Sequence, residues 1–254
     1  MKVLAVSPHM DDAVLSAGGR IFDLTASGHE VVVMTMFAGS AFPPYSPLAR
    51  SLHELWGLAH DPVSARRLED ARALAGLRAE PWHADFLDAI YRRDLSGWQF
   101  AEEAALTAPH EDADLRAKLY QAVHEALATR PDLVLTAAAV GMHVDHVVVR
   151  DAVVGACRDS GIPVRLWQDL PYAAWAPRVP PDIGLGAAER VSMSSAAWRA
   201  KCAAVACYAS QLPVLWPGQA DFRVPLAAHA AFGPGDGFAE TFWPVHVAAG
   251  PWRA

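Results

Sequence analysis

Short apolar runs alternate with longer segments of helical spacing along much of this chain, and this order most constrains its fold. Residues 2–7 and 30–37 are mostly apolar, and residues 13–26 between them carry apolar side chains at helical spacing. The order recurs, with strands predicted over 132–136 and 163–166 and helices over 64–77, 111–129 and 147–158. Repeated β-α-β order with nearly continuous apolar strands predicts a parallel sheet covered on both faces. We therefore expect an α/β fold, a Rossmann-like three-layer sandwich with a mostly parallel sheet.

Three stretches interrupt this order and are predicted to form long loops at the carboxyl edge of the sheet. Residues 41–61 contain three prolines, residues 85–110 lack a clean periodicity, and residues 171–190 are again rich in proline. Loops of this kind usually shape a site, so we expect all three to surround the functional residues. One more helix is predicted over 196–209. The chain shows no internal repeat or linker, so residues 1–254 are predicted to form a single domain.

Charge, hydropathy and cysteine content exclude several classes of protein. The chain has 254 residues and a formal net charge of −7, which gives no electrostatic reason to bind nucleic acid. No apolar run reaches the roughly 18 residues of a membrane helix, and Pro8 and His9 interrupt the apolar start too early for a signal peptide. Cys157, Cys202 and Cys207 lack metal-binding spacing and suit a reducing compartment as small buried side chains. We expect a cytoplasmic protein, with a homo-oligomer left open.

A cluster of polar side chains directly follows the first predicted strand. Residues 7–12 read SPHMDD, which places His9, Asp11 and Asp12 at a strand end. The carboxyl end of a strand is where ligands bind in an open α/β sheet. Neighbouring aspartates point in different directions, so one can bind a metal while the other faces a water molecule. A helix N-cap is the alternative, but a cap needs a single aspartate and leaves His9 unexplained.

A second cluster lies at an equivalent position near the middle of the chain. Residues 141–146 read GMHVDH and stand between the predicted strand 132–136 and the helix after it. They add His143, Asp145 and His146 at a second strand end. Together the two clusters supply a His/His/Asp set, which leaves an open coordination position on a catalytic zinc.

The two motifs resemble those of the PIG-L family of zinc-dependent N-deacetylases, also called LmbE-like, whose members carry (P)HPDDE and HxDH motifs. Further matches in the expected order extend the resemblance over nearly the whole chain. They are Arg66 to Glu69 with the later Ala75-Gly76-Leu77, Asp169 to Tyr172, Trp198 with Lys201 and Ser210-Gln211, and Gly237 to Phe242.

The resemblance implies roles for the residues of both motifs. The implied metal ligands are His9, Asp12 and His146, holding Zn²⁺ or, alternatively, Fe²⁺. Asp11 is implied as the general base that activates the attacking water. His143 is implied beside the developing oxyanion, as electrostatic stabiliser or general acid, with Asp145 orienting it.

Substrate-binding residues are implied less directly, and each has a structural alternative. Arg66 is a candidate contact for a sugar hydroxyl or phosphate, or a solvated arginine on a helix face. Asp88 is a candidate sugar contact or a turn or helix-cap carboxylate. Tyr172 is a third candidate, or core packing after a strand. Three tryptophans are candidates for an apolar wall that stacks on a sugar: Trp82, Trp175 and Trp216.

Two positions depart from the family motif. Met10 replaces its proline, which removes a fixed φ angle, and Ala13 replaces its glutamate, which removes a carboxylate near the site. Loss of such an outer contact typically costs about 10–100-fold in metal affinity or activity. Because every implied ligand is present, the sequence predicts an active enzyme rather than an inactive relative.

The resulting prediction is a zinc-dependent hydrolase that removes an N-acyl group, in the first place N-acetyl, from an amino sugar or its conjugate. The first alternative is a metal-dependent amidase that acts on a non-sugar or thiol-conjugate amide in specialised metabolism. A nucleotide-binding domain is disfavoured because it needs a glycine-rich turn after the first strand, where this chain has two carboxylates. A metal-binding protein without catalysis leaves Asp11 unexplained.

Overall fold

In a computed structural model of the chain, residues 1–58, 60–175, 185–233 and 237–245 are described. They contain a seven-stranded sheet in the order β3-β2-β1-β6-β7-β9-β8. The five strands β3, β2, β1, β6 and β7 pair in parallel, and β9 runs antiparallel between β7 and β8. The strands are β1 Lys2–Ser7, β2 Glu30–Thr35, β3 Glu80–His83, β6 Leu133–Ala137, β7 Val164–Trp167, β8 Glu189–Met193 and β9 Phe238–Pro244.

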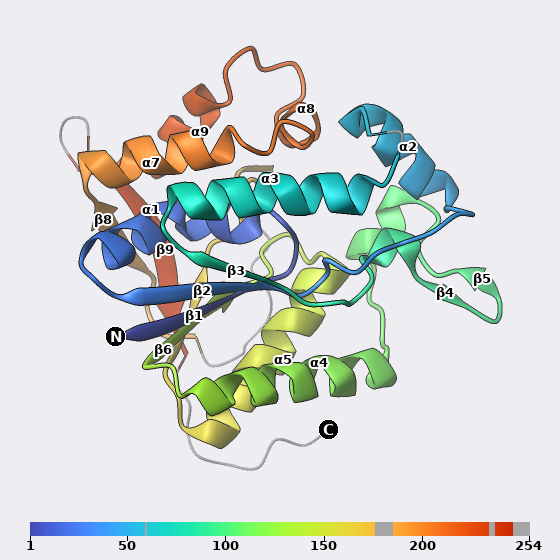
Figure 1. The fold of residues 1–254 in the computed structure, drawn as a ribbon, viewed down its shortest axis with the longest axis horizontal. Coiled ribbons are helices and arrows are strands. Elements are labelled where there is room, and N and C mark those ends of the chain that lie inside the picture. The colour runs from blue at the N-terminus through green and yellow to red at the C-terminus, as the bar shows by residue number, and fades with distance from the viewer. Residues whose placement is uncertain (59, 176–184, 234–236, 246–254) are drawn as a thin grey trace.

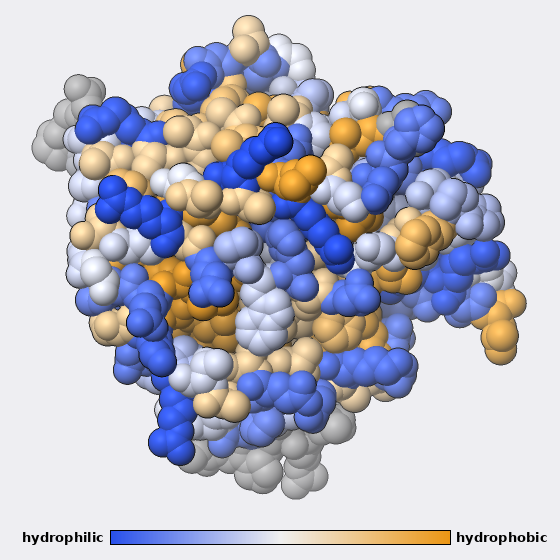
Figure 2. Space-filling view, in the orientation of Figure 1, coloured by the Kyte–Doolittle hydropathy of each residue, from blue (hydrophilic) through white to orange (hydrophobic). Residues whose placement is uncertain are grey.

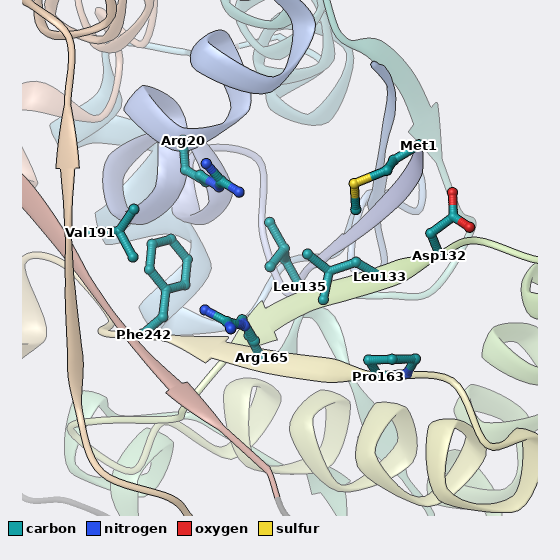
Figure 3. Close-up of a pocket in the computed structure, with 9 residues that line it drawn as sticks. All are labelled: Met1, Arg20, Asp132, Leu133, Leu135, Pro163, Arg165, Val191 and Phe242. Carbon is teal, nitrogen blue, oxygen red and sulfur yellow. The ribbon is translucent and has the colours of Figure 1, made fainter. Parts of the chain in front are cut away.

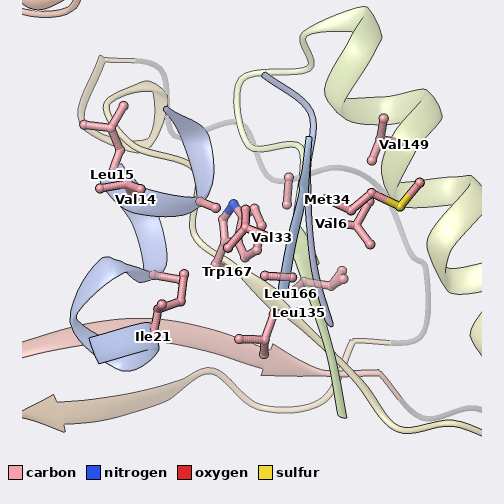
Figure 4. Packing of buried hydrophobic residues seen from close by; sticks show 14 of the residues in the cluster. Val6, Val14, Leu15, Ile21, Val33, Met34, Leu135, Val149, Leu166 and Trp167 are labelled. Atoms are coloured by element: carbon pink, nitrogen blue, oxygen red, sulfur yellow. The ribbon is translucent and has the colours of Figure 1, made fainter. Parts of the chain in front are cut away.

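Helices cover both faces of this sheet (Figure 1). Helices α1 (Asp12–Ala26), α3 (Pro62–Gly76) and α7 (Ser195–Val205) lie on one face, and α4 (Ala113–Ala126) and α5 (Val144–Ser160) lie on the other. Figure 4 shows side chains of α1 and α5 approaching the central strands from opposite sides. This arrangement confirms the predicted three-layer α/β sandwich, and it explains why β1 is buried along almost its whole length.

The strand order reverses between β1 and β6, which are neighbours in the sheet. From β1 the chain continues outward to β2 and β3, whereas β6 leads outward on the other side to β7. A crevice opens at the carboxyl ends of the strands at such a switch point. The first polar motif follows β1 directly, and the second, residues 141–146, lies between the end of β6 and the first turn of α5, so the topology brings the two motifs to the same edge of the sheet.

The predicted and observed elements differ at several boundaries, and two of the differences concern the surroundings of the polar motifs. The stretch 41–61 contains a helix, α2 (Pro47–Trp56), where a loop was expected. Its prolines indicate a loop in the sequence, but Pro47 occupies the first helical position, where proline is favoured, and Ser46 caps the helix by accepting the Ala49 N–H at 2.9 Å. Helix α5 begins at Val144 instead of 147, so Asp145 and His146 lie in its first turn.

Several short elements lacked a periodicity that could predict them. Beyond the strands β3, β8 and β9, they are α6 Tyr172–Trp175, α8 Leu212–Leu215, α9 Arg223–Ala230, the hairpin of β4 Arg93–Asp94 and β5 Gly97–Trp98, and the 3₁₀ turns η1 Ala89–Tyr91, η2 Glu103–Thr107 and η3 Leu127–Thr129. The three cysteines are free thiols, with Cys157 and Cys202 buried as expected and Cys207 partly exposed. None of the described helices is long and apolar enough to span a membrane.

A buried ion pair fastens the C-terminal strand to the first helix. Lys201 on α7 is completely buried and donates to the Glu240 carboxylate on β9 at 2.6 Å. The same carboxylate accepts the backbone N–H groups of Gly19 and Arg20 on α1, each at 2.8 Å. One carboxylate therefore joins three elements inside the protein. Figure 2 shows the exterior, where hydrophilic side chains are interspersed with apolar ones across the visible face.

Candidate metal centre

The two polar motifs meet at the carboxyl ends of β1 and β6. The Asp12 Oδ2 atom lies 3.2 Å from Nδ1 of His9 and 3.3 Å from Nε2 of His146. All three side chains are buried, and His146 is completely so. One ligand atom from each residue lies within 4.8 Å of the others. The structure thus brings together the three residues that the sequence implied as metal ligands.

The hydrogen bonds of the two histidines leave one nitrogen of each directed at the centre of this cluster. Nδ1 of His146 bonds the Asp169 carboxylate at 2.7 Å, while its buried Nε2 has no hydrogen-bond partner among the described residues. Nε2 of His9 bonds the Asp145 carboxylate at 3.1 Å, which leaves Nδ1 facing Asp12. A carboxylate on the outer nitrogen is the usual arrangement around a metal-binding histidine. Two imidazole nitrogens and one carboxylate oxygen fit a divalent metal such as zinc.

A second group of possible ligands shares His9 and adds His143 and Asp145. Most of its ligand atoms are already engaged, and only Nε2 of His143 has no protein partner among the described residues. Both oxygens of Asp145 accept hydrogen bonds from protein groups, including the Arg92 guanidinium at 2.5 Å, and Nδ1 of His143 accepts the Asp145 backbone N–H at 3.2 Å. The cluster of His9, Asp12 and His146 is therefore the better candidate.

The position of Asp145 revises the expected way in which His143 is oriented. The Asp145 carboxylate bonds Arg92, His9 and the Ala89 N–H, whereas only its backbone N–H reaches the His143 ring. This difference arises because His143 is the N-cap of α5, a position from which a side chain accepts a backbone N–H of the first turn. With Nδ1 accepting, the ring proton resides on Nε2. Burial and the nearby His9 lower the pKa of His143 to about 3, so the ring is a neutral hydrogen-bond donor.

The neighbouring carboxylates Asp11 and Asp12 have opposite protonation behaviour. Burial and the charge of Asp12 raise the pKa of Asp11 to about 7, although Arg66 opposes this rise. Burial also acts to raise the pKa of Asp12, but His146 and His9 outweigh it and hold that pKa far below its usual value. Two carboxyl groups whose environments separate their pKa values commonly have separate chemical roles.

Asp11 also adopts a backbone conformation that is unusual for a residue with a side chain. Its φ and ψ angles are 152° and −33°, and its N–H bonds the carbonyl of His9 at 3.1 Å. Strained residues of this kind persist where the surrounding structure determines them, and they cluster at active sites. Here the strained turn holds Asp11 and Asp12 at the start of α1, beside the imidazole of His9.

The implied substrate-binding residues all lie next to this cluster. Arg66 is buried with its guanidinium 4.8 Å above the Trp56 ring, so it is not a solvated arginine. Asp88 caps η1 through one oxygen, while the other lies 3.8 Å from Nε2 of His9 and 3.9 Å from Nη1 of Arg66. The Tyr172 ring is half-buried, with its centroid 5.3 Å from that of His146.

The predicted tryptophan wall forms only in part. Trp175 and Trp216 line one hollow of about 300 Å³, together with Pro171 next to Tyr172. Trp82 instead lies on β3 and lines a different hollow. A further cavity of about 370 Å³ opens beside Asp132 and Pro163, which precede β6 and β7 and therefore lie at the opposite edge of the sheet (Figure 3).

Parts of the three predicted loops approach the cluster, whereas residues 185–190 of the third stretch instead pair with β9. Trp56 from 41–61 lies under Arg66, η1 from 85–110 contacts Asp145, and Tyr172 stands beside His146. Residues 176–184 of the third stretch lie outside the described residues. Sequence reasoning did not place Arg92 or Asp169 at the site. Asp169 belongs to a recognised motif, whereas nothing in the irregular stretch around Arg92 distinguishes it.

Gly141 provides a direct test of how Tyr172 is placed. Its φ is +92°, and a Cβ atom there would lie 2.9 Å from the Cβ of Tyr172. Gly141→Ala is therefore expected to destabilise the protein and to lower kcat/KM by displacing Tyr172. Gly161→Ala is the matched control, because its φ is +66° with no atom near the added Cβ. The control should show only the backbone cost of about 1–2 kcal/mol, with activity retained. Equal thermal stability and activity in the two variants would contradict this account.

Comparisons with known proteins agree with this fold and site. The family model described as PIG-L, GlcNAc-PI de-N-acetylase, matches residues 4–157. The chain belongs to the PIG-L family.

Particular relatives narrow the comparison. The chain is 36% identical over 175 residues to 2'-N-acetylparomamine deacetylase of Streptomyces fradiae; the match spans 68% of this chain but only 58% of that relative. Teicoplanin deacetylase Orf2, solved in a zinc-inhibited form, is 38% identical with a TM-score of 0.86 and coverage of 96% and 97% of the two chains. The A40926 pseudoaglycone deacetylase Dbv21 is 41% identical with a TM-score of 0.85 and coverage of 98% of each chain.

Proposed function

We propose that this protein is a metal-dependent hydrolase that removes an N-acyl group, in the first place N-acetyl, from an amino sugar carried on a larger molecule. The observation that carries the proposal is the convergence of His9, Asp12 and His146, with the unpartnered Nε2 of His146 directed at Asp12 and Asp11 standing next to this set. A donor set with an adjacent base of pKa about 7 suits amide hydrolysis near neutral pH.

The residues of the site divide the chemistry between them. A divalent ion held by His9, Asp12 and His146 would polarise the amide carbonyl and acidify the attacking water. Asp11 takes a proton from that water as it forms its bond to the carbonyl carbon. His143 donates its Nε2–H to the carbonyl oxygen as negative charge develops there. The proton on Asp11 is then available to the amine nitrogen as the C–N bond breaks.

The proposed substrate is a glycopeptide that carries an N-acylated amino sugar. Support comes from the two glycopeptide deacetylase structures, which match this chain over nearly the full length of both partners. The aminoglycoside relative is matched over a smaller share of its length. We propose that three residues contact the sugar, because they lie beside the metal cluster and are not among its ligands. They are Arg66, Asp88 and Tyr172.

Chelation tests the requirement for a metal. Removing bound metal is expected to abolish hydrolysis, and an equimolar amount of Zn²⁺ should restore it, since the carbonyl would otherwise lack its electrophile. Hydrolysis is measured by mass spectrometry as loss of an acetyl group from three substrates: a glycopeptide bearing N-acetylglucosamine, 2'-N-acetylparomamine and a simple N-acetylated amine. Full activity after verified metal removal would refute the proposal.

The same panel separates the alternatives. Preference for the simple amine would favour the non-sugar amidase. Preference for acetylparomamine would move the substrate to the aminoglycosides. Metal binding without hydrolysis of any amide would favour a binding protein.

A further inference from the structure

Arg92 is a buried arginine that lies against two aromatic rings and donates a hydrogen bond to one carboxylate. Only 8% of its surface is exposed, and its guanidinium lies 5.3 Å from the Phe37 ring centroid and 5.0 Å from that of Phe100. Its Nη2 atom donates to Asp145 at 2.5 Å, whereas Nε and Nη1 have no hydrogen-bond partner among the described residues. Burying a charged group with two unpaired donors costs free energy, and the ion pair with Asp145 is the contact that offsets this cost.

Residues at the two ends of the 3₁₀ turn η1 donate hydrogen bonds to the Asp145 carboxylate. The Ala89 N–H at the start of the turn donates to Oδ2 of Asp145 at 2.9 Å, and Arg92, which ends the turn, donates to Oδ1. The carboxylate cannot rotate without breaking one of these bonds. Asp145 itself is completely buried, so water cannot replace either donor.

The carboxylate held in this way bonds the imidazole of His9. Its Oδ2 lies 3.1 Å from Nε2 of His9, and this contact turns Nδ1 toward Asp12. Outer contacts of this kind fix the ring orientation and the tautomer of a metal-binding histidine. His9 lies between β1 and α1, outside any helix or strand, whereas His146 lies in the first turn of α5.

We propose that Arg92 is a positioning residue that orients the metal ligand His9 through Asp145. The inference rests on the proposed function, because it takes His9 as a ligand. The role gives η1, in the irregular stretch 85–110, a part in directing one donor nitrogen of the metal centre. Among the described residues Arg92 forms no hydrogen bond with His9, Asp12 or His146, so its polar link to His9 runs through Asp145. The Phe37 ring lies 5.3 Å from the guanidinium and 5.9 Å from the His9 ring, and the double-mutant cycle below separates this apolar route from the polar one.

The test measures zinc affinity instead of activity alone. Arg92→Met is expected to raise the Kd for zinc by about 10–100-fold, measured in competition with a chelating dye. Arg92→Lys should recover most of the affinity, because a single donor contact joins the arginine to Asp145. Arg150→Met is the matched control: Arg150 is similarly buried on α5, but its guanidinium contacts Asp151 and the Ala138 carbonyl instead of Asp145. The control should bind zinc like the wild type.

A double-mutant cycle distinguishes this route from a general structural effect. In an Asp145→Asn background, adding Arg92→Met should weaken zinc binding no further, because the path is already broken. If Arg92→Met alone does not fold, the double variant is compared with Asp145→Asn, and a further loss of zinc affinity still overturns the inference. A large additional loss in the double variant would overturn the inference, as would wild-type zinc affinity in folded Arg92→Met. In both cases zinc binding and hydrolysis by the wild type would leave the proposed function standing.

Discussion

Asp11→Asn is expected to lower kcat by about 10²–10⁴-fold while zinc content stays close to that of the wild type. The amide keeps the size of the carboxylate but cannot accept the proton of the attacking water. His9, Asp12 and His146 remain to hold the metal, because Asp11 is not among the converging ligand atoms. Metal content is measured by plasma mass spectrometry and kcat by release of the free amine.

Asp12→Asn is the matched variant at the neighbouring position. A neutral amide is a poor ligand, so this variant should lose bound zinc and, with it, activity. The two isosteric substitutions should therefore fail in different ways. Loss of zinc from Asp11→Asn with retention in Asp12→Asn would show that the two roles are reversed. Full activity and metal content in both variants would place the active site elsewhere.

Lys201→Met is expected to destabilise the protein by about 3–5 kcal/mol, because it leaves the Glu240 carboxylate buried without its cation. Both side chains lie in the interior, and the carboxylate also holds the backbone of α1 beside β9. The free energy of unfolding is measured by denaturant titration, monitored by circular dichroism.

Lys118→Met provides the control for the ion pair. Lys118 donates to Asp114 at 2.6 Å, but both side chains are exposed on α4, so solvent screens the pair and Lys118→Met should change the free energy of unfolding far less than Lys201→Met. Similar losses in the two variants would mean that burial does not set the strength of the Lys201–Glu240 pair.

Much of the architecture was predictable from the sequence. Strands covered on both faces must be apolar almost throughout, so β1, β2, β6 and β7 were visible as short apolar runs. The edge and antiparallel strands β3, β8 and β9 were not predicted, because they are less buried than the central strands and lack continuous apolar runs. Helix α2 was not predicted, because prolines indicate a loop in the sequence, whereas Pro47 in fact occupies the first position of a helix capped by Ser46.

The residues of the candidate site could be predicted, but most of their contacts could not. That His9, Asp11, Asp12 and His146 follow strands and precede helices is visible in the sequence, because it is a local property of the chain. Only the tertiary structure decided what their outer atoms contact. Arg92 and Asp145 are 53 residues apart, and His9 and Asp145 are 136 apart. Such contacts depend on how an irregular stretch packs against two strand ends, and no local spacing encodes that packing.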